Sequence, residues 1–231
     1  MEISKRLKTV AGEVKYTTVA DIGTDHGYVP IYLVKNKLAD MTIACDINKG
    51  PLLKARENIA ANCLSSKIET RLGSGLTPIV IGEVETAVIA GMGGMLIIEI
   101  LKESCEVVQS LKQLVLQPQL DIDSVRRYIH SIGFKIGNEE MLIDEGKYYT
   151  VINAVHGEEE TYNPCQYMFG KINLDKKSII LERYLIHKLG KLTEIKEELK
   201  NSGTENSIKK IDELENEILI FKEALTAYEV Q

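Results

Sequence analysis

The sequence contains no tryptophan, only four cysteines and four histidines in 231 residues, and no apolar run of the roughly 20 residues that a membrane-spanning helix needs. No two cysteines form a C-x-x-C pair and the histidines are scattered, which disfavours a zinc site. The first residues, MEISKRLKTVAGEV, lack the apolar core of a signal peptide. We therefore expect a cytoplasmic protein with reduced thiols and with neither a metal nor a membrane partner.

The chain also lacks an excess of positive charge, because 34 acidic and 28 basic residues give a net charge of −6. That balance argues against nucleic acid as a partner of the whole surface, but local clusters are basic. One cluster consists of Lys171, Lys176, Lys177, Arg183, Lys188 and Lys191. A second consists of Lys5, Arg6, Lys8 and Lys15, while Arg126 and Arg127 are weaker candidates. Each cluster is either an RNA contact or an ordinary solvated helix face.

Apolar runs that alternate with helical patterns dominate the first two thirds of the chain. They predict strands at 17–22, 41–46, 67–72, 85–90 and 113–117, and helices at 3–10, 29–38, 51–63, 95–103 and 122–132. Such alternation is typical of right-handed βαβ units, so we expect an α/β fold with a mostly parallel, doubly wound sheet. The runs 134–143 and 148–155 have no helix between them, and the turn signal at 144–147 should join them into an antiparallel hairpin.

The last third of the chain has no strand pattern. Residues 156–166 are polar and indicate a linker, and two apolar repeats at helical spacing follow, over 181–199 and 208–228. The polar segment 201–207 separates them, so we expect an antiparallel, coiled-coil-like helical hairpin. The sequence thus predicts two domains, at 1–157 and 165–231, and we favour a monomer.

The turn after the first strand, in the stretch VADIGTDHGYVP at 19–30, is both glycine-rich and acidic. A dinucleotide fold would carry G-x-G-x-x-G here, facing a pyrophosphate. The spacing is instead D-x-G-x-D-x-G, and the carboxylates of Asp21 and Asp25 would repel a phosphate. They suit a cation such as S-adenosylmethionine (SAM), which carries an ammonium and a sulfonium and no phosphate. A NAD-linked oxidoreductase is disfavoured for the same reason.

Two further strand ends fit this interpretation. Asp46 ends the second strand and can accept hydrogen bonds from ribose hydroxyls, although it could also cap the next helix. The fourth strand ends in AGMGG at 90–94, which offers no side-chain acceptor. Methyltransferases acting on exocyclic amines often have Asn/Asp-Pro-Pro-aromatic there, so the absence of an acceptor favours a ring nitrogen as the methyl acceptor.

Four motifs together resemble one family: VADIGTDHGYVP, RLGSGL at 71–76, AGMGG at 90–94 and LQPQ at 116–119. Over nearly the whole chain the sequence resembles the bacterial tRNA (adenine(22)-N1)-methyltransferases, the TrmK family. The resemblance implies a Rossmann-like class I SAM-methyltransferase fold, whose sheet ends in an antiparallel hairpin, and tRNA as partner. It implies cofactor contacts at Arg6, Asp21, Gly23, His26, Gly27, Asp46, Ser74, Gly75, Gly91 and Met92. Ser74 departs from the Asp that we expect more often in the family.

The chemistry we expect is direct SN2 transfer to N1 of a flipped adenine, without a covalent enzyme intermediate. Asp25 is the candidate catalytic group, because a carboxylate would stabilise the positive charge that methylation creates. His26 is either a general base or, more simply, a hydrogen-bonding loop residue.

The turn of the last hairpin should lie on the active-site face. Lys147, Tyr148 and Tyr149 follow it and could contact the flipped base, or form a cross-strand aromatic pair in an edge strand. The first helix of the C-terminal hairpin, with Lys171, Lys176, Lys177, Arg183 and Lys188, is the other candidate RNA contact. Two alternatives remain open from the sequence: a methyltransferase for a small molecule, and a non-catalytic RNA-binding scaffold.

Overall fold

The computed structural model describes residues 3–202 and 205–229, and the side chains among these except at 202 and 205–209. Contacts within the chain divide it into two units, Met1–Glu159 and Glu160–Gln231. This boundary lies in the interval between the two predicted domains, 1–157 and 165–231. None of the helices in the described ranges is long and apolar enough to cross a membrane.

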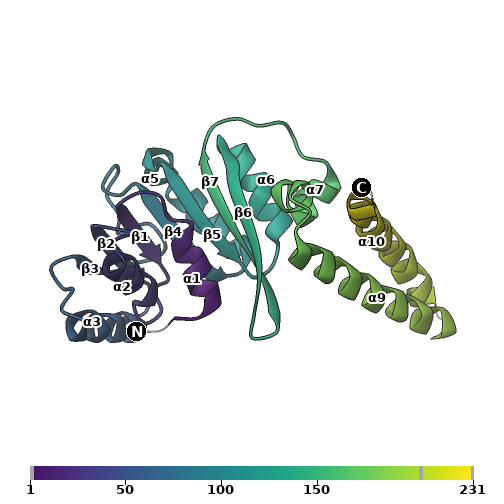
Figure 1. The fold of residues 1–231 in the computed structure, drawn as a ribbon, viewed down its shortest axis with the longest axis horizontal. Coiled ribbons are helices and arrows are strands. Elements are labelled where there is room, and N and C mark those ends of the chain that lie inside the picture. Colours follow the sequence, from purple (N-terminus) through teal and green to yellow (C-terminus); the bar gives the residue numbers. More distant parts are fainter. Residues whose placement is uncertain (1–2, 203–204, 230–231) are drawn as a thin grey trace. The chain divides into compact units, whose positions relative to one another are not determined.

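The first unit is built on a seven-stranded sheet in the order β3-β2-β1-β4-β5-β7-β6 (Figure 1). Its strands are β1 Thr18–Ile22, β2 Met41–Asp46, β3 Ile68–Leu72, β4 Thr86–Met92, β5 Gln113–Pro118, β6 Phe134–Asp144 and β7 Lys147–His156. The pairs among β1 to β5 are parallel, whereas β7 is antiparallel to both β5 and β6. The predicted parallel sheet with an antiparallel hairpin is confirmed, and β7 lies inside the sheet while β6 forms its edge.

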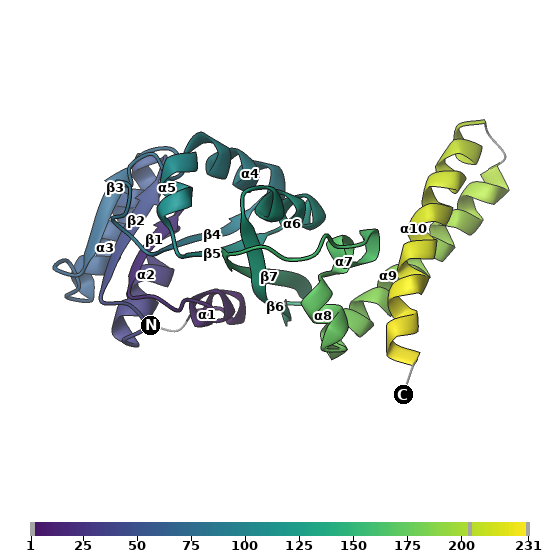
Figure 2. The same ribbon diagram turned by 90° about the horizontal axis from the view of Figure 1, so that it is seen from above.

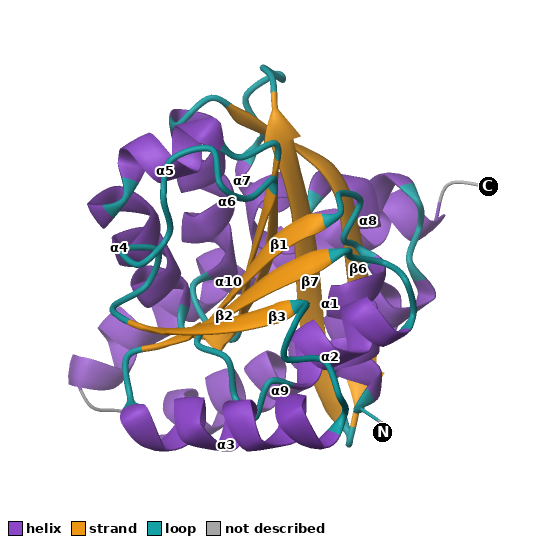
Figure 3. Cartoon of the chain, turned by 90° about the vertical axis from the view of Figure 1, so that its left-hand side faces the viewer, coloured by secondary structure: helices purple, strands orange, loops and turns teal. Residues whose placement is uncertain are grey.

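Helices cover both faces of this sheet. Figure 3 shows α1 Lys5–Gly12, α2 Tyr28–Lys35 and α3 Lys49–Ala61 on one face, and α4 Gly94–Glu103, α5 Cys105–Ser110 and α6 Ile122–Ser131 on the other. Apolar side chains such as Val10, Val19, Val29 and Val88 are buried between α1, α2 and the sheet. This burial provides the main drive for folding of the unit. The short helix α5 has no counterpart among the predicted helices.

Among its described residues, the second unit contains helices joined by short connections and no strand. It contains α7 Pro164–Phe169, α8 Lys171–Asp175, α9 Ile179–Ser202 and α10 Glu205–Glu229. The two long helices lie side by side (Figures 1 and 2), with Leu185 and Phe221 buried and an ion pair of 2.6 Å between Lys196 and Glu215. The predicted break at 201–207 lies partly outside the described residues, and α9 and α10 extend into it from both sides.

The predicted linker over 156–166 was too long. The strand β7 continues through His156, and α7 begins at Pro164. Asn163 accepts a hydrogen bond from the backbone N–H of Gln166, whose side chain in turn accepts from the backbone N–H of Asn163. This capping box, with proline in the first turn, starts a helix within a segment whose composition suggested only a loop.

Candidate functional site

A cleft of about 490 Å³ opens at the carboxyl ends of the parallel strands in the first unit. Its lining residues follow β1, β2, β3, β4 and β5, where the topology of an open α/β sheet places ligands. Seven of the residues predicted to contact a cofactor line it, together with Asp25: Arg6, Gly23, Asp46, Ser74, Gly75, Gly91 and Met92. Asp21 lines a smaller cavity beside it, which also touches Arg6, Gly23 and Asp25.

Close approach of two loops shapes the centre of this cleft. Gly23 has a left-handed backbone with φ of +72°, and a Cβ there would lie 2.1 Å from Cε of Met92. Gly91, after β4, is also left-handed, with φ of +80°. Glycine therefore lets the β1 and β4 ends expose their backbones to a ligand at positions where a side chain would intrude.

Two carboxylates, Asp25 and Asp46, line the cleft, and a third, Asp21, lines the smaller cavity beside it. Asp21 is buried, and burial, with the nearby Asp46 carboxylate, raises its pKa to about 6. No Lys or Arg in the described part of the chain forms an ion pair with Asp21. The Asp25 side chain is largely exposed and lies 3.2 Å from Nε2 of His26. A buried carboxylate without a cationic partner fits a ligand that brings its own positive charge.

Asp46 is not the N-cap of α3, because that position is occupied by Asn48. Its Oδ1 accepts a hydrogen bond of 2.7 Å from the backbone N–H of Asn48, the residue that precedes α3. This bond joins Asp46 to the residue before α3, and Asp46 also lines the cleft. The geometry therefore suits an acceptor for a pair of ribose hydroxyls next to Asn48.

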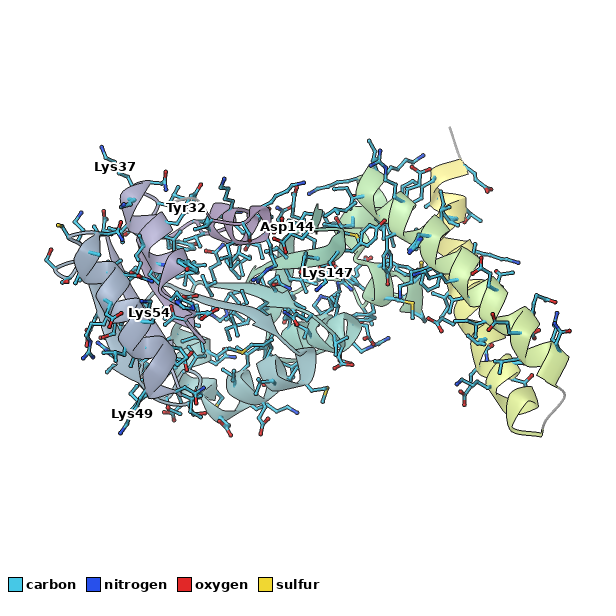
Figure 4. The ribbon with its side chains drawn as sticks, turned by 90° about the horizontal axis from the view of Figure 1, so that it is seen from below. Tyr32, Lys37, Lys49, Lys54, Asp144 and Lys147 are labelled. Carbon is cyan, nitrogen blue, oxygen red and sulfur yellow. The ribbon has the colours of Figure 1, made fainter. Side chains whose placement is uncertain are left out.

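Arg6 is the single Lys or Arg on the cleft wall among the described residues. Its Nη1 donates to Oε1 of Gln117 at 2.7 Å, and its guanidinium lies 5.6 Å from the centre of the Tyr149 ring. Its backbone N–H donates to the carboxylate of Asp144, which Figure 4 shows beside α1. These contacts place one positive group opposite the acidic loop, where a ligand carboxylate could bind.

The comparisons with known proteins agree with this geometry. Residues 3–152 match the family model described as "Methyltransferase domain". The chain is 32% identical to the tRNA (adenine(22)-N(1))-methyltransferase of Bacillus subtilis, over 97% of this chain and 98% of that protein. The crystal structure of B. subtilis TrmK has a TM-score of 0.86, with 31% identity over 97% of this chain and 99% of that one.

The chain belongs to the TrmK family of methyltransferases. A further member, Streptococcus pneumoniae Sp1610, described as a putative tRNA (m1A22) methyltransferase, is 30% identical and has a structure in complex with S-adenosyl-L-methionine. That structure has a TM-score of 0.84 and covers 97% of this chain and 100% of the other. The expectation of a SAM-dependent methyltransferase is confirmed.

Two of the residues predicted to contact the cofactor, His26 and Gly27, line neither the cleft nor the smaller cavity. His26 has a left-handed backbone with φ of +59°, its carbonyl accepts from the side chain of Asn58, and its ring stacks on Tyr28 at 5.3 Å. Gly27 packs against α3, because a Cβ there would lie 3.3 Å from Cβ of Ala55. In the described structure both residues fix the shape and packing of the loop.

Residues of the hairpin turn stand near the cleft without lining it. Lys147 and Asp144 pair across the turn (Figure 4), and Tyr149 approaches Arg6. Tyr148 and Tyr149 pair across the strands with Ile143 and Leu142 of β6, neither of which is aromatic. The alternative of a cross-strand aromatic pair is therefore wrong.

The basic residues predicted on the first hairpin helix do not all lie on it: Lys171 is on α8, Lys176 and Lys177 lie in the turn after α8, and only Arg183, Lys188 and Lys191 are on α9. Lys171 pairs with Asp175 one helical turn away at 2.5 Å, while Arg183, Lys188 and Lys191 are exposed along α9. Within the described ranges, no group of three His, Cys, Asp or Glu could hold a metal ion. The four cysteines are unpaired thiols, with Cys45 and Cys165 buried.

Gln117 and Gln119 were not predicted as site residues. The sequence placed them only within the motif LQPQ, yet Gln117 holds Arg6 and Gln119 lines the cleft. The order of the sheet explains this, because β5 lies directly beside β4 and brings its carboxyl end to the same cleft. The only signal in the sequence was a pair of amides following a buried strand.

The close approach at Gly23 leads to a first prediction. We expect Gly23→Ala to weaken binding of S-adenosylhomocysteine (SAH), the demethylated form of the cofactor, by about 10-fold or more. The added Cβ must displace the end of the Met92 side chain within the cleft. The alanine must also hold a left-handed backbone, and this conformation costs about 1 to 2 kcal/mol. Isothermal titration calorimetry measures the effect. Gly12→Ala is the control, since nothing lies within 4 Å of its Cβ position, and unchanged affinity in Gly23→Ala would contradict the prediction.

Proposed function

We propose that this protein transfers the methyl group of SAM to N1 of an adenine in tRNA, as the name of its B. subtilis relative states for that protein. The observation that carries the proposal is the cleft itself. One side of the cleft is an acidic, glycine-rich turn, and another is the end of β4. The residues at the end of β4 have no side chain that could accept a hydrogen bond from the base. As tRNA is a cytoplasmic substrate, the proposal also places the protein in the cytoplasm.

The residues around the cleft fit the parts of SAM. The Asp46 carboxylate would accept from the ribose hydroxyls, the turn with Ser74 and Gly75 would border the adenine, and Asp21 would face the ammonium. Arg6 would hold the methionine carboxylate. When bound, SAM supplies an electrophilic methyl group on a sulfonium. The neighbouring Gly91 and Met92 close the cleft beside the point of transfer.

The methyl acceptor follows from what the β4 end lacks. An exocyclic amine shares its lone pair with the ring and needs acceptors that make it nucleophilic. The residues 91–94 are Gly-Met-Gly-Gly and provide no such acceptor. The lone pair of adenine N1 lies in the plane of the ring and is available without help, provided that the base leaves its pairing partner and enters the cleft.

Asp25 would contribute to catalysis through its charge. N1 methylation leaves a cationic base, and a carboxylate near it lowers the energy of the developing charge. Asp25 lines both the main cleft and the smaller cavity, and its side chain is 79% exposed. It can therefore face an incoming base while the buried Asp21 serves the cofactor.

Two regions are proposed as RNA contacts. In the first unit, Lys147, Tyr148 and Tyr149 begin β7 next to Arg6. In the second, Lys171, Lys176, Lys177, Arg183 and Lys188 lie on α8, α9 and the turn between them. Such local basic surfaces are needed because the whole chain is acidic, with a net charge of −6.

Methyl transfer to unmodified tRNA is the direct test. We expect that purified protein with labelled SAM yields 1-methyladenosine, identified by mass and retention time after nuclease digestion. A matched tRNA with guanine in place of adenine 22 should remain unlabelled. A labelled tRNA with another methylated nucleoside, or no transfer by a protein that still binds SAH, would overturn the proposal. Turnover of a small molecule without tRNA, or failure to bind SAH at all, would point to the two alternatives in turn.

A further inference from the structure

Backbone hydrogen bonds join the loop after β5 to the end of β4. The backbone N–H of Gln119 donates to the carbonyl of Met92 at 2.8 Å, and that of Gly94 donates to the carbonyl of Leu120 at 2.9 Å. A Cβ at Gly94 would lie only 2.5 Å from the Leu120 oxygen, so the two loops can approach this closely only with glycine there. Asp121 then adopts a left-handed backbone with φ of +53° before α6 begins. These contacts between the two loops therefore fix the position of the Gln119 backbone.

The side chain of Gln119 is exposed and lines the cleft. Its amide makes no hydrogen bond with any residue that the structure describes, and its Nε2 lies 3.9 Å from the Cβ position of Gly91. Nη1 of Arg6 lies 3.5 Å from the same position on the other side. The Gln117 amide, by contrast, is engaged at both ends, with Arg6 and with the carbonyl of Pro118. Gln119 is thus a free donor and acceptor pair where the methyl acceptor would enter.

The chemistry of an amide restricts what it can bind there. A side-chain amide pairs with a neighbouring donor and acceptor, and adenine presents such a pair on two edges, N6 with N1 and N6 with N7. Pairing with N6 and N1 would occupy the lone pair that must receive the methyl group. Only the edge with N6 and N7 leaves N1 free. Guanine presents two acceptors, O6 and N7, on that edge, and pyrimidines have no N7.

We propose that Gln119 determines base specificity by hydrogen-bonding the N6 and N7 edge of the flipped adenine, which leaves N1 facing the methyl group. Its Oε1 accepts from one N–H of the N6 amine and its Nε2 donates to N7. This pairing turns N6 toward Gln119 and away from the methyl group, so the acceptor on N6 orients the base and does not make N6 the target. The half-exposed Leu96, also on the cleft wall, offers an apolar surface for the ring. This inference rests on the proposed function, since it names how that site selects its base.

The test compares two proteins on two RNAs. Model tRNAs carry either adenosine or 7-deazaadenosine at the methylated position, and kcat/KM is measured for the wild type and for Gln119→Ala. We expect 7-deazaadenosine to lower the wild-type value about 10- to 100-fold relative to adenosine, as loss of one paired base edge does elsewhere. On the adenosine tRNA, kcat/KM of Gln119→Ala should be lower than that of the wild type by a similar factor. In Gln119→Ala, replacing adenosine by 7-deazaadenosine should then cause little further loss of kcat/KM. Because the replaced atom also alters the basicity of N1, only the difference between the proteins is interpreted.

Two controls isolate the effect of the amide. Gln109→Ala removes an amide on α5 that donates to the Ile132 carbonyl outside the cleft, and it should behave as the wild type on both RNAs. SAH affinity should be the same in all three proteins. An equal penalty from 7-deazaadenosine in the wild type and in Gln119→Ala would overturn the proposal, as would a loss of SAH affinity in Gln119→Ala. If the proposed function itself failed, even the wild type would leave the adenosine tRNA unmethylated.

Discussion

Replacing Asp21 by Asn should make the protein more stable at pH 7.5 while removing its affinity for the cofactor. Burial raises the pKa of Asp21 from 3.8 to about 6, so at pH 7.5 the folded protein holds a charge that the unfolded chain solvates better. A shift of this size corresponds to about 3 kcal/mol, since one pKa unit is about 1.4 kcal/mol. Asn removes that charge at nearly the same volume. SAH binding should fall at least 100-fold, because the variant lacks the buried carboxylate that we propose as the partner of the ammonium.

The pH dependence identifies the cause. A carboxyl whose pKa is raised on folding contributes stability that is fully present below its unfolded pKa of 3.8 and is lost as pH rises through about 6. The gain in unfolding free energy from Asp21→Asn should therefore be largest above pH 7 and should shrink toward pH 4. Urea unfolding of both proteins between pH 4 and 8 measures it. The exposed Asp40→Asn serves as control, with no expected pH-dependent difference. A gain that did not change with pH would contradict the electrostatic explanation.

Part of the cleft could be predicted from the sequence, because the residues that suit a cationic ligand directly follow buried strands. The acidic turn, Asp46 and the AGMGG segment each follow a buried strand, and a parallel sheet brings such strand ends to one edge. The residue types at those ends therefore indicated a cationic ligand before any contact was known. Strand and helix positions followed from periodicity in the same way, and the elements that it did not predict were the short helices α5, α7 and α8.

Contacts across long stretches of the chain could not be predicted from local pattern. Arg6 entered only through family resemblance, because its partners Gln117 and Asp144 lie 111 and 138 positions away. Gln119 was missed because a lone amide has no pattern of its own, and its role depends on β5 pairing with β4. Gly27 matched a ligand-binding motif, yet in the structure its missing side chain admits Ala55 of α3. A glycine motif does not by itself distinguish ligand approach from helix packing.

Asp25 should be required for turnover and not for cofactor affinity. We expect Asp25→Ala to lower kcat for tRNA methylation about 100-fold, the usual effect of removing one group that stabilises transition-state charge. SAH affinity should change by less than about 3-fold, because the Asp25 side chain is 79% exposed whereas Asp21, the residue proposed to face the ammonium, is buried. Single-turnover methylation and calorimetry with SAH separate the two quantities.

A conservative variant distinguishes charge from loop structure. Asp25 lies 3.2 Å from Nε2 of His26, whose backbone is left-handed. The alternative role for Asp25 is therefore to stabilise that loop, with no effect of its charge on the reaction. Asn keeps the shape and the ability to accept a hydrogen bond from His26, but it has no charge. If charge stabilisation is the role, Asp25→Asn is as slow as Asp25→Ala; if the loop contact is the role, Asn restores turnover. Equal losses of turnover and SAH affinity in Asp25→Ala would instead assign the residue to cofactor binding.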